Sequence, residues 1–329
     1  MAEITVEQAK AIPVRKKTPF FLDMIVRLFK TKPLGALGFV IIMVLWFVGI
    51  FADLLAPYGW NEIMLQHRLA PPGPGLLLGA DNVGRDLLSR IIFGARISMT
   101  VSLAAQGITT VVKLIIAVPS GYYGGKFDMI VQRFVDAFLC FPALALYLTV
   151  MAVLGPGIWQ LIVVLGISNG IRSTRVIRSA VMRIKEEQYF EAARAIGVPN
   201  RTILWRHVLP NIMSVVIINL AAGMGGVITA EASLSFLGLG IPPPYPSWGG
   251  MLSGAGRQFM MVAPWMMVWP GVALSAVVFG FQMLADALRD LLDPRLRGGL
   301  GRYGGLSQEQ LQKLAEKKIA EGAAQKKGA

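Results

Sequence analysis

Hydrophobic residues gather in six long stretches separated by polar segments. A helix needs about 20 apolar residues to cross roughly 30 Å of hydrocarbon, and most of the stretches reach or approach that length. The fourth has only 14 residues, but Arg172, Arg175 and Arg178 follow it at helical spacing, where long side chains can reach a membrane surface. The pattern predicts an all-α membrane protein with six transmembrane helices, over residues 34–52, 97–121, 137–154, 158–171, 210–230 and 265–285.

Positive charge predicts the orientation of these helices. If the N-terminus is cytoplasmic, 26 of the 32 Lys and Arg residues fall in segments on the cytoplasmic side and only 5 fall outside, with Lys113 within a stretch. Cytoplasmic loops are enriched in Lys and Arg, so we expect both termini inside. The expected parts are a cytoplasmic N-terminal segment (1–33), a six-span domain (34–297) and a cytoplasmic C-terminal tail (298–329).

The composition agrees with a membrane protein. The chain is 54% hydrophobic and 16% charged, whereas soluble domains carry about 25% charged residues. A net charge of +13 can indicate nucleic-acid binding, but here the positive charge follows the predicted topology and faces the lipid bilayer. No nucleic-acid partner is therefore expected. The first stretch is longer than a signal-peptide core, so we expect it to stay in the membrane.

A charged segment, residues 186–211, interrupts this hydrophobic chain. Residues 186–196 are good helix formers, and Gly197 with the proline that follows it ends the helix. Asn200 is suited to cap a second short helix over 200–207. One face is slim enough for another protein to approach closely, because it carries Ala192, Ala193 and Ala195. The alternative is an ordinary amphipathic loop between two spans.

This segment resembles the "EAA" loop of the membrane subunits of ABC importers. Glu191, Ala192 and Ala193 open the pattern, Gly197 follows after three residues, and Leu209-Pro210 closes it. The general pattern has an Ile three residues before that proline, where this chain has His207. The resemblance implies a cytoplasmic coupling helix that docks on an ATPase, with six coupling residues: Glu191, Ala192, Ala193, Gly197, Leu209 and Pro210.

Residues 78–90, 231–240 and 286–297 extend the resemblance to the C-type permeases of the dipeptide, oligopeptide and nickel importer family, over about residues 20–297. This implies a type I ABC importer permease fold with multiple spans in a bacterial or archaeal cytoplasmic membrane. It also implies that the chain forms half of a translocation path. We expect peptides as the cargo, and nickel chelates, glutathione and oligosaccharides are the alternatives. The implied partners are a second, B-type permease, two cytoplasmic ABC ATPases that bind ATP and Mg²⁺, and an extracytoplasmic binding protein.

Several charged residues lie outside the 186–211 segment. Asp81, Arg85 and Asp86 precede the second stretch, where they either form a surface ion-pair cluster, which contributes little stability, or contact a binding protein. Glu231 ends a long uncharged run, and we expect it to close an outer gate or contact the binding protein.

Ionisable residues within membrane spans are costly, so Lys113 and Asp136 are also candidates. Lys113 lines a pore, pairs with a carboxylate of a neighbouring subunit, reaches the inner interface through its flexible stem, or pairs with Asp136. The small residues of 221–226 suit either a pore-lining helix or a tight packing interface.

The chain lacks the signatures of catalysis. It has no phosphate-binding Gly-x-x-x-x-Gly-Lys-[Ser/Thr] loop, and its single cysteine, Cys140, and two histidines, His67 and His207, do not suggest a metal site. We therefore expect no enzyme activity and no bound cofactor. A membrane-embedded enzyme is the alternative that this absence counts against.

The other alternative is an ion-driven secondary transporter. Ion coupling needs membrane carboxylates, and Asp136 and Glu231 lie near the ends of their stretches. Inhibition of uptake by vanadate would separate ATP-driven transport from both alternatives.

Overall fold

The structure is a computed structural model that describes residues 20–292. The chain divides into two compact units, Met1–Leu288 and Arg289–Ala329, and only residues 289–292 of the second are described. Within 20–292 every regular element is helical, since the only β-pairing is two isolated bridges. The helices before the 186–211 segment are α2 (Phe20–Thr31), α3 (Pro33–Ile50), α4 (Ala52–Leu55), η1 (Leu65–His67), α5 (Leu87–Tyr123), α6 (Gly125–Leu139), α7 (Ala143–Leu154), α8 (Ile158–Arg172) and α9 (Thr174–Lys185).

The remaining helices are α10 (Gln188–Ala195), α11 (Asn200–Thr202), the π-helical η2 (Ile203–Val208), α12 (Leu209–Phe236), α13 (Trp248–Leu252), α14 (Gly254–Gln258) and α15 (Trp265–Leu292). Among residues 20–292, four helices are long and apolar enough to cross a membrane: α3, α5, α15 and the continuous helix Asn200–Phe236. The number is five if the bent pair of α6 and α7 counts as one span, and α8 is apolar but shorter. The all-helical, multi-span architecture expected from the hydrophobic pattern is therefore present.

The third hydrophobic stretch is not the single helix predicted over 137–154. α6 ends at Leu139 and α7 begins at Ala143, and the two helices meet at an angle of 83°. Pro142 lies at the break, where it lacks an amide hydrogen and disfavours helical geometry at the residue before it. The fourth stretch behaves as expected, because α8 is followed directly by the helical continuation α9.

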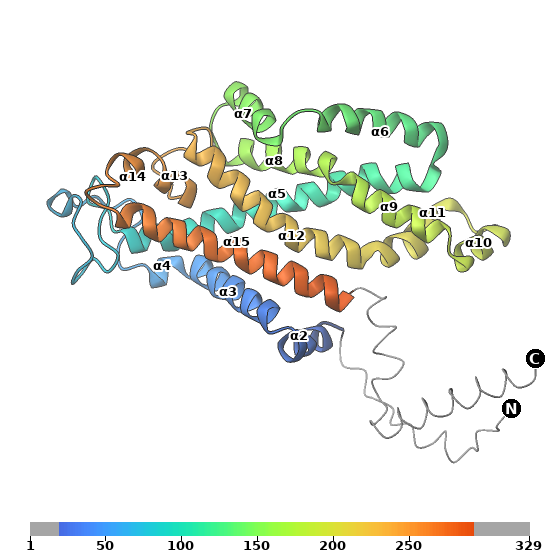
Figure 1. Ribbon diagram of the computed structural model, residues 1–329, viewed down its shortest axis with the longest axis horizontal. Coiled ribbons are helices and arrows are strands. Elements are labelled where there is room, and N and C mark those ends of the chain that lie inside the picture. Colours follow the sequence, from blue (N-terminus) through green and yellow to red (C-terminus); the bar gives the residue numbers. More distant parts are fainter. Residues whose placement is uncertain (1–19, 293–329) are drawn as a thin grey trace, which may run out of the picture. The chain divides into compact units, whose positions relative to one another are not determined.

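The helix α5 is the central element of the first unit. Its 37 residues span about 55 Å at 1.5 Å per residue, and it contacts α3, α8, α9 and α12 (Figure 1). The contact with α8 is close because Gly166 and Gly170 face α5. A Cβ atom at Gly166 would lie 2.7 Å from Cβ of Ile108, and one at Gly170 would lie 2.6 Å from Cβ of Val112. Small residues four apart are a general device for close helix packing in membranes.

The two ends of this unit differ in what they carry. The loops before α5 and the short helices α13 and α14 gather at one end, and α10 and α11 lie at the opposite end (Figure 1). The indole of Trp248 is fully buried and donates a hydrogen bond of 3.2 Å to the carbonyl of Ile91. Trp248 is therefore a core residue at the loop-rich end.

Three expectations fall wholly or partly on undescribed residues. The cytoplasmic tail over 298–329 and most of the N-terminal segment over 1–33 lie outside the described range, and so does the end of the 286–297 motif.

Candidate functional site

The 186–211 segment folds against the end of α5. α10 covers Gln188–Ala195, so the helix expected over 186–196 is present but shorter at both ends. Gly197 turns the chain with a φ of 77°, a left-handed conformation that glycine adopts without steric cost. This confirms the predicted helix stop at Gly197.

The second half of the segment differs from the prediction. Asn200 does not cap a separate helix; Pro199 occupies the cap position, and one 37-residue helix runs from Asn200 to Phe236. Pro210 has no amide hydrogen and so cannot form the usual helical hydrogen bond to the carbonyl four residues earlier. The π-helical turn η2 lies directly before it. Such local widening lets a helix continue past a proline. The segment is therefore joined rigidly to the membrane helix, with Leu209 half-buried and Pro210 exposed.

α10 presents two different faces. Phe190 is buried in a cluster with Ile203 and Val208, and Ala193 is buried as well. The exposed face carries Ala192 and Ala195 together with the charged residues Glu191 and Arg194. The expectation that Ala193 shares this slim face is wrong, because Ala193 points to the inner side of the helix. Large apolar side chains are also exposed nearby, with Ile196 80% and Trp205 66% accessible. Exposed apolar groups rimmed by charges are typical of a protein-docking surface.

Direct contacts join this segment to α5. The Tyr122 hydroxyl donates a hydrogen bond of 2.6 Å to Oδ1 of Asn200, and the Tyr122 ring packs edge-on against Phe190. Lys185 Nζ donates to the carbonyl of Tyr122 over 2.8 Å, at the helix end where the dipole favours a cation. A displacement of α10 therefore acts on the end of α5 without an intervening flexible loop.

Ion pairs fix α6 against α9. Arg178 Nε donates to Asp128 Oδ1 over 2.6 Å, and this bond raises the pKa of the Arg178 guanidinium. Asp136 accepts a hydrogen bond from Arg175 and lies 3.6 Å from Arg133. The proposed pairing of Lys113 with Asp136 is wrong, because Arg133 of the same helix and Arg175 of α9 lie at that carboxylate instead.

A polar groove of about 690 Å³ opens between α5, α7, α8 and α12. α5 lines it with Gln106, Thr109 and Lys113, which lie on one face of the helix because they are three and four residues apart. α8 adds Asn169 and Arg172. Polar side chains gathered within a largely apolar lining are what a path for a hydrophilic solute needs.

The small residues of 221–226 take part both in helix packing and in the lining of the groove. Gly225 packs against α15, where an added Cβ would lie 3.3 Å from Cβ of Phe281. Gly223 and Gly226 line the groove, and a Cβ at Gly226 would meet nothing within 4 Å. One face of α12 is thus a packing seam, and the other keeps the groove open.

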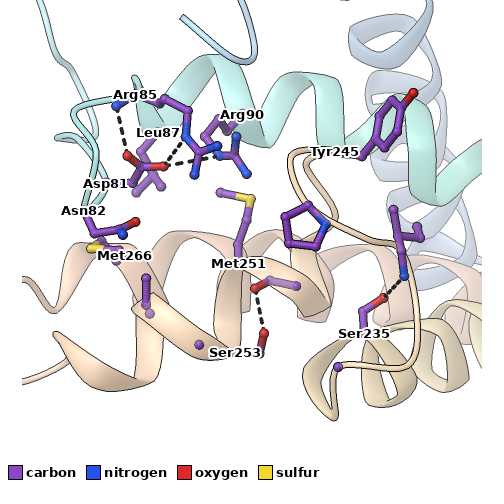
Figure 2. Close-up of a pocket in the computed structure, with 17 residues that line it drawn as sticks. Asp81, Asn82, Arg85, Leu87, Arg90, Ser235, Tyr245, Met251, Ser253 and Met266 are labelled. Carbon is purple, nitrogen blue, oxygen red and sulfur yellow. Dashed lines mark hydrogen bonds and ion pairs between the residues drawn. The ribbon is translucent and has the colours of Figure 1, made fainter. Parts of the chain in front are cut away.

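A second pocket, of about 300 Å³, lies at the loop-rich end (Figure 2). Figure 2 shows the Asp81 carboxylate between Arg85 and Arg90, with distances of 2.7 Å to Arg85 Nε and 3.7 Å to Arg90 Nε. Asp81 Oδ1 also accepts from the amides of Val83 and Arg85. This cluster is not the surface ion pair considered from the sequence, because Asp81 is 4% and Arg90 7% exposed.

Asp86 and Glu231 are buried as well. Asp86 caps α5 by accepting from the amide and hydroxyl of Ser89, both over 2.7 Å, rather than joining an ion pair. Glu231 is 1% exposed, and its Oε1 accepts from the hydroxyl of Ser235 over 2.8 Å. Burial speaks against direct contact of Glu231 with a binding protein in this conformation, and its role at an outer gate stays a prediction.

Sequence reasoning missed most of the groove. Gln106, Asn169 and Asn219 are uncharged, and the search for membrane ionisable groups passed over them. Their signal was present, since polar residues recur at helical spacing within apolar runs.

Residues 20–292 contain no group of three or more His, Cys, Asp and Glu side chains placed to hold a metal ion.

Comparison with known families gives two matches. Residues 113–298 match the model of the binding-protein-dependent transport system inner membrane component, and residues 21–72 match the N-terminal transmembrane domain of oligopeptide transport permease C. Together they cover most of the chain.

Individual relatives belong to the same kind of transport system. The chain is 37% identical over 268 residues to the dipeptide transport system permease protein DppC of Alkalihalophilus pseudofirmus, covering 82% of this chain and 88% of the relative. It is 32% identical to the oligopeptide transport system permease protein OppC of Bacillus subtilis (86% and 92% covered). It is 36% identical to the glutathione transport system permease protein GsiD of Escherichia coli (83% and 90% covered). Among solved structures, the MetNI methionine ABC transporter aligns with a TM-score of 0.46 at 18% identity, over 59% of this chain and 94% of that one.

Proposed function

Since this chain belongs to the binding-protein-dependent transport system inner membrane component family, we propose that it forms half of the peptide path of an ABC importer. The family consists of inner-membrane permeases and is not a family of catalytic enzymes. Membership implies that the chain works with ATPases and other partners. Peptide is the proposed cargo because relatives named for dipeptides and oligopeptides match over most of their length. Glutathione is the alternative that one relative's name supports, and nickel chelates and oligosaccharides are further alternatives.

The proposed topology has six spans with both termini in the cytoplasm. α3, α5, α12 and α15 supply four spans, the bent pair of α6 and α7 a fifth, and α8 a sixth. The distribution of Lys and Arg supports this orientation. It assigns the 186–211 segment to the cytoplasm and the loops before α5 to the outside, at opposite ends of the same helices (Figure 1). The proposed parts remain the N-terminal segment 1–33, the permease domain 34–297 and the tail 298–329.

The observation that carries the proposal is the two-faced helix α10. Its inner face is held by Phe190, which packs on Tyr122 of α5 and in the cluster with Ile203, and Tyr122 also bonds Asn200 at the start of the helix that continues into α12. Glu191 and Ala192 remain exposed for docking. In the proposed mechanism, two cytoplasmic ATPases bind ATP and Mg²⁺ and grip α10 of this chain and its counterpart in a second, B-type permease. Closure of the ATPases moves α10, and the rigid connection carries that movement to α5 and α12. The open and closed ATPases contact α10 differently, which is what lets ATP shift the permease between states.

The polar groove is the proposed contribution of this chain to the path. The B-type permease would supply the other wall. An extracytoplasmic binding protein would deliver peptide at the end that carries Asp81, Arg85 and Asp86. Because these residues are largely buried, we propose that they hold the loops that receive the binding protein. Buried Glu231 and the loop beside it would close the outer end.

Affinity purification of the tagged chain in mild detergent tests this proposal. We expect a second permease and one or two ATPases to co-purify, together with the binding protein when peptide is present. Recovery of a stable homo-oligomer without any ATPase would contradict the proposed function.

A further inference from the structure

The polar groove carries a charge without a counterion. Lys113 lines it and is 1% exposed. Among residues 20–292 no carboxylate pairs with Lys113 and no hydrogen bond is formed by its ammonium. The nearby carboxylates are already engaged, since Asp136 pairs with Arg175 and Asp128 with Arg178. A buried ammonium without a partner is costly, so this position is poised to accept a negative group.

A second cation lines the same groove. Arg172 donates through its terminal nitrogen to the carbonyl of Phe141, but its Nε is buried without a hydrogen-bond partner. The neighbouring Asn169 accepts the Tyr147 hydroxyl on Oδ1 over 2.8 Å, which leaves its amide nitrogen to donate. The groove therefore offers the ammonium of Lys113 on α5 and the amide of Asn169 on α8, with the positive charge of Arg172 beside them.

Acidic residues do not balance these donors. The described residues that line the groove include neither Asp nor Glu. Gly226 lines the α12 side of the groove and a Cβ there would meet nothing within 4 Å, so a solute has room to enter. A cationic, donor-rich wall with an open face is complementary to an anion.

We propose that Lys113, supported by Arg172 and Asn169, forms an anion subsite in the groove that receives the carboxylate of the passing substrate. In a peptide this group is the C-terminal carboxylate. The inference rests on the proposed path and deepens it, because it makes this chain itself a determinant of selectivity. The subsite favours cargo that bears a free carboxylate over amidated peptides and neutral oligosaccharides.

The test uses the complete importer in proteoliposomes, with its partner permease, ATPases and binding protein. The probes are a pool of di- to pentapeptides with free C-termini and the same pool as C-terminal amides, both quantified inside the vesicles by mass spectrometry. The variants are Lys113→Gln, which removes the charge, and Lys113→Arg, which keeps it. Lys126→Gln is the matched control, since Lys126 is an exposed lysine on α6 away from the groove.

We expect Lys113→Gln to reduce uptake of the free acids roughly tenfold, the size of one charge-assisted hydrogen bond. Uptake of the amides, and ATP hydrolysis stimulated by the binding protein, should remain at the wild-type level. Lys113→Arg and Lys126→Gln should retain uptake of the acids. If the wild-type complex imports only the free acids, the test is the uptake of the acids by the two Lys113 variants, which should fall for Lys113→Gln and persist for Lys113→Arg.

Unchanged uptake of acids by Lys113→Gln would overturn the subsite, and so would an equal loss of acids and amides. Failure of the wild-type complex to import any peptide would instead overturn the proposed function.

Discussion

The Tyr122 hydroxyl donates a hydrogen bond of 2.6 Å to the side-chain oxygen of Asn200, two residues separated by 78 positions in the chain. This bond joins the end of α5 to the start of the helix that continues into α12. Both helices line the polar groove. The contact thus lies between the proposed ATPase-docking segment and the proposed path.

Replacing Tyr122 with Phe should weaken this connection. The loss of one neutral hydrogen bond costs about 1 kcal/mol, so we expect normal assembly but reduced coupling. The measurement is the ratio of peptide imported to ATP hydrolysed in proteoliposomes, which should fall several-fold. The adjacent Tyr123→Phe is the control, since the Tyr123 side chain is 58% exposed. Equal ratios in the two variants would contradict the role given to Tyr122.

Phe190 holds α10 against the bundle, and Phe190→Ala should release it. Truncating a buried Phe costs about 3–5 kcal/mol, and Phe190 is 2% exposed in the cluster with Ile203 and Val208. We expect faster hydrogen exchange across residues 188–195 and loss of co-purifying ATPase, while the membrane helices remain inserted. Exchange that is unchanged in this region would show that α10 is held by other contacts.

Gly170 allows the close approach of α8 to α5, and Gly170→Ala should separate them. The added Cβ would lie 2.6 Å from Cβ of Val112, and overpacking of this kind typically costs about 1–3 kcal/mol. Gly107→Ala is the matched control, because a Cβ on that α5 glycine meets nothing within 4 Å. We expect a lower Tm of the purified complex only for Gly170→Ala. A similar Tm for the two variants would refute the packing argument.

Asp81 holds the loops at the outer end, and Asp81→Ala should loosen them. Its carboxylate pairs with Arg85 and lies near Arg90, both with largely buried side chains. Removing one partner of a buried ion pair costs about 3–5 kcal/mol because it leaves an uncompensated charge. The Tm should fall, whereas it should not fall for Glu62→Gln, which alters an exposed carboxylate. An unchanged Tm for Asp81→Ala would mean that water molecules replace the carboxylate as hydrogen-bond partners of both arginines.

The sequence predicted the helical class and the helix break at Gly197, because hydrophobic runs and glycine act locally. It did not predict the break at Pro142 within an apolar run, since the hydropathy of 137–154 does not reveal a bend. The sequence also did not predict that 200–207 continues into the following span. Pro210 suggested a helix boundary there, but the π-helical turn before it lets the helix continue. The groove depends on which faces of α5, α8 and α12 meet. Gly166 and Gly170 set the face of α8 that packs on α5, and this contact between distant segments cannot be read from the local sequence pattern.

The most direct test of coupling through the 186–211 segment is ATP-dependent peptide uptake by the complex that carries Gly197→Asp. Gly155→Asp is the matched control, because Gly155 also has a positive φ of 81° and open space around its Cα, at the end of α7. Backbone strain is therefore similar in the two variants, and only Gly197 lies on the proposed docking surface. We predict that Gly197→Asp abolishes uptake and weakens ATPase co-purification while the chain still inserts, and that Gly155→Asp transports normally. Normal uptake by Gly197→Asp, or equal loss in both variants, would contradict the coupling of ATP hydrolysis through this segment.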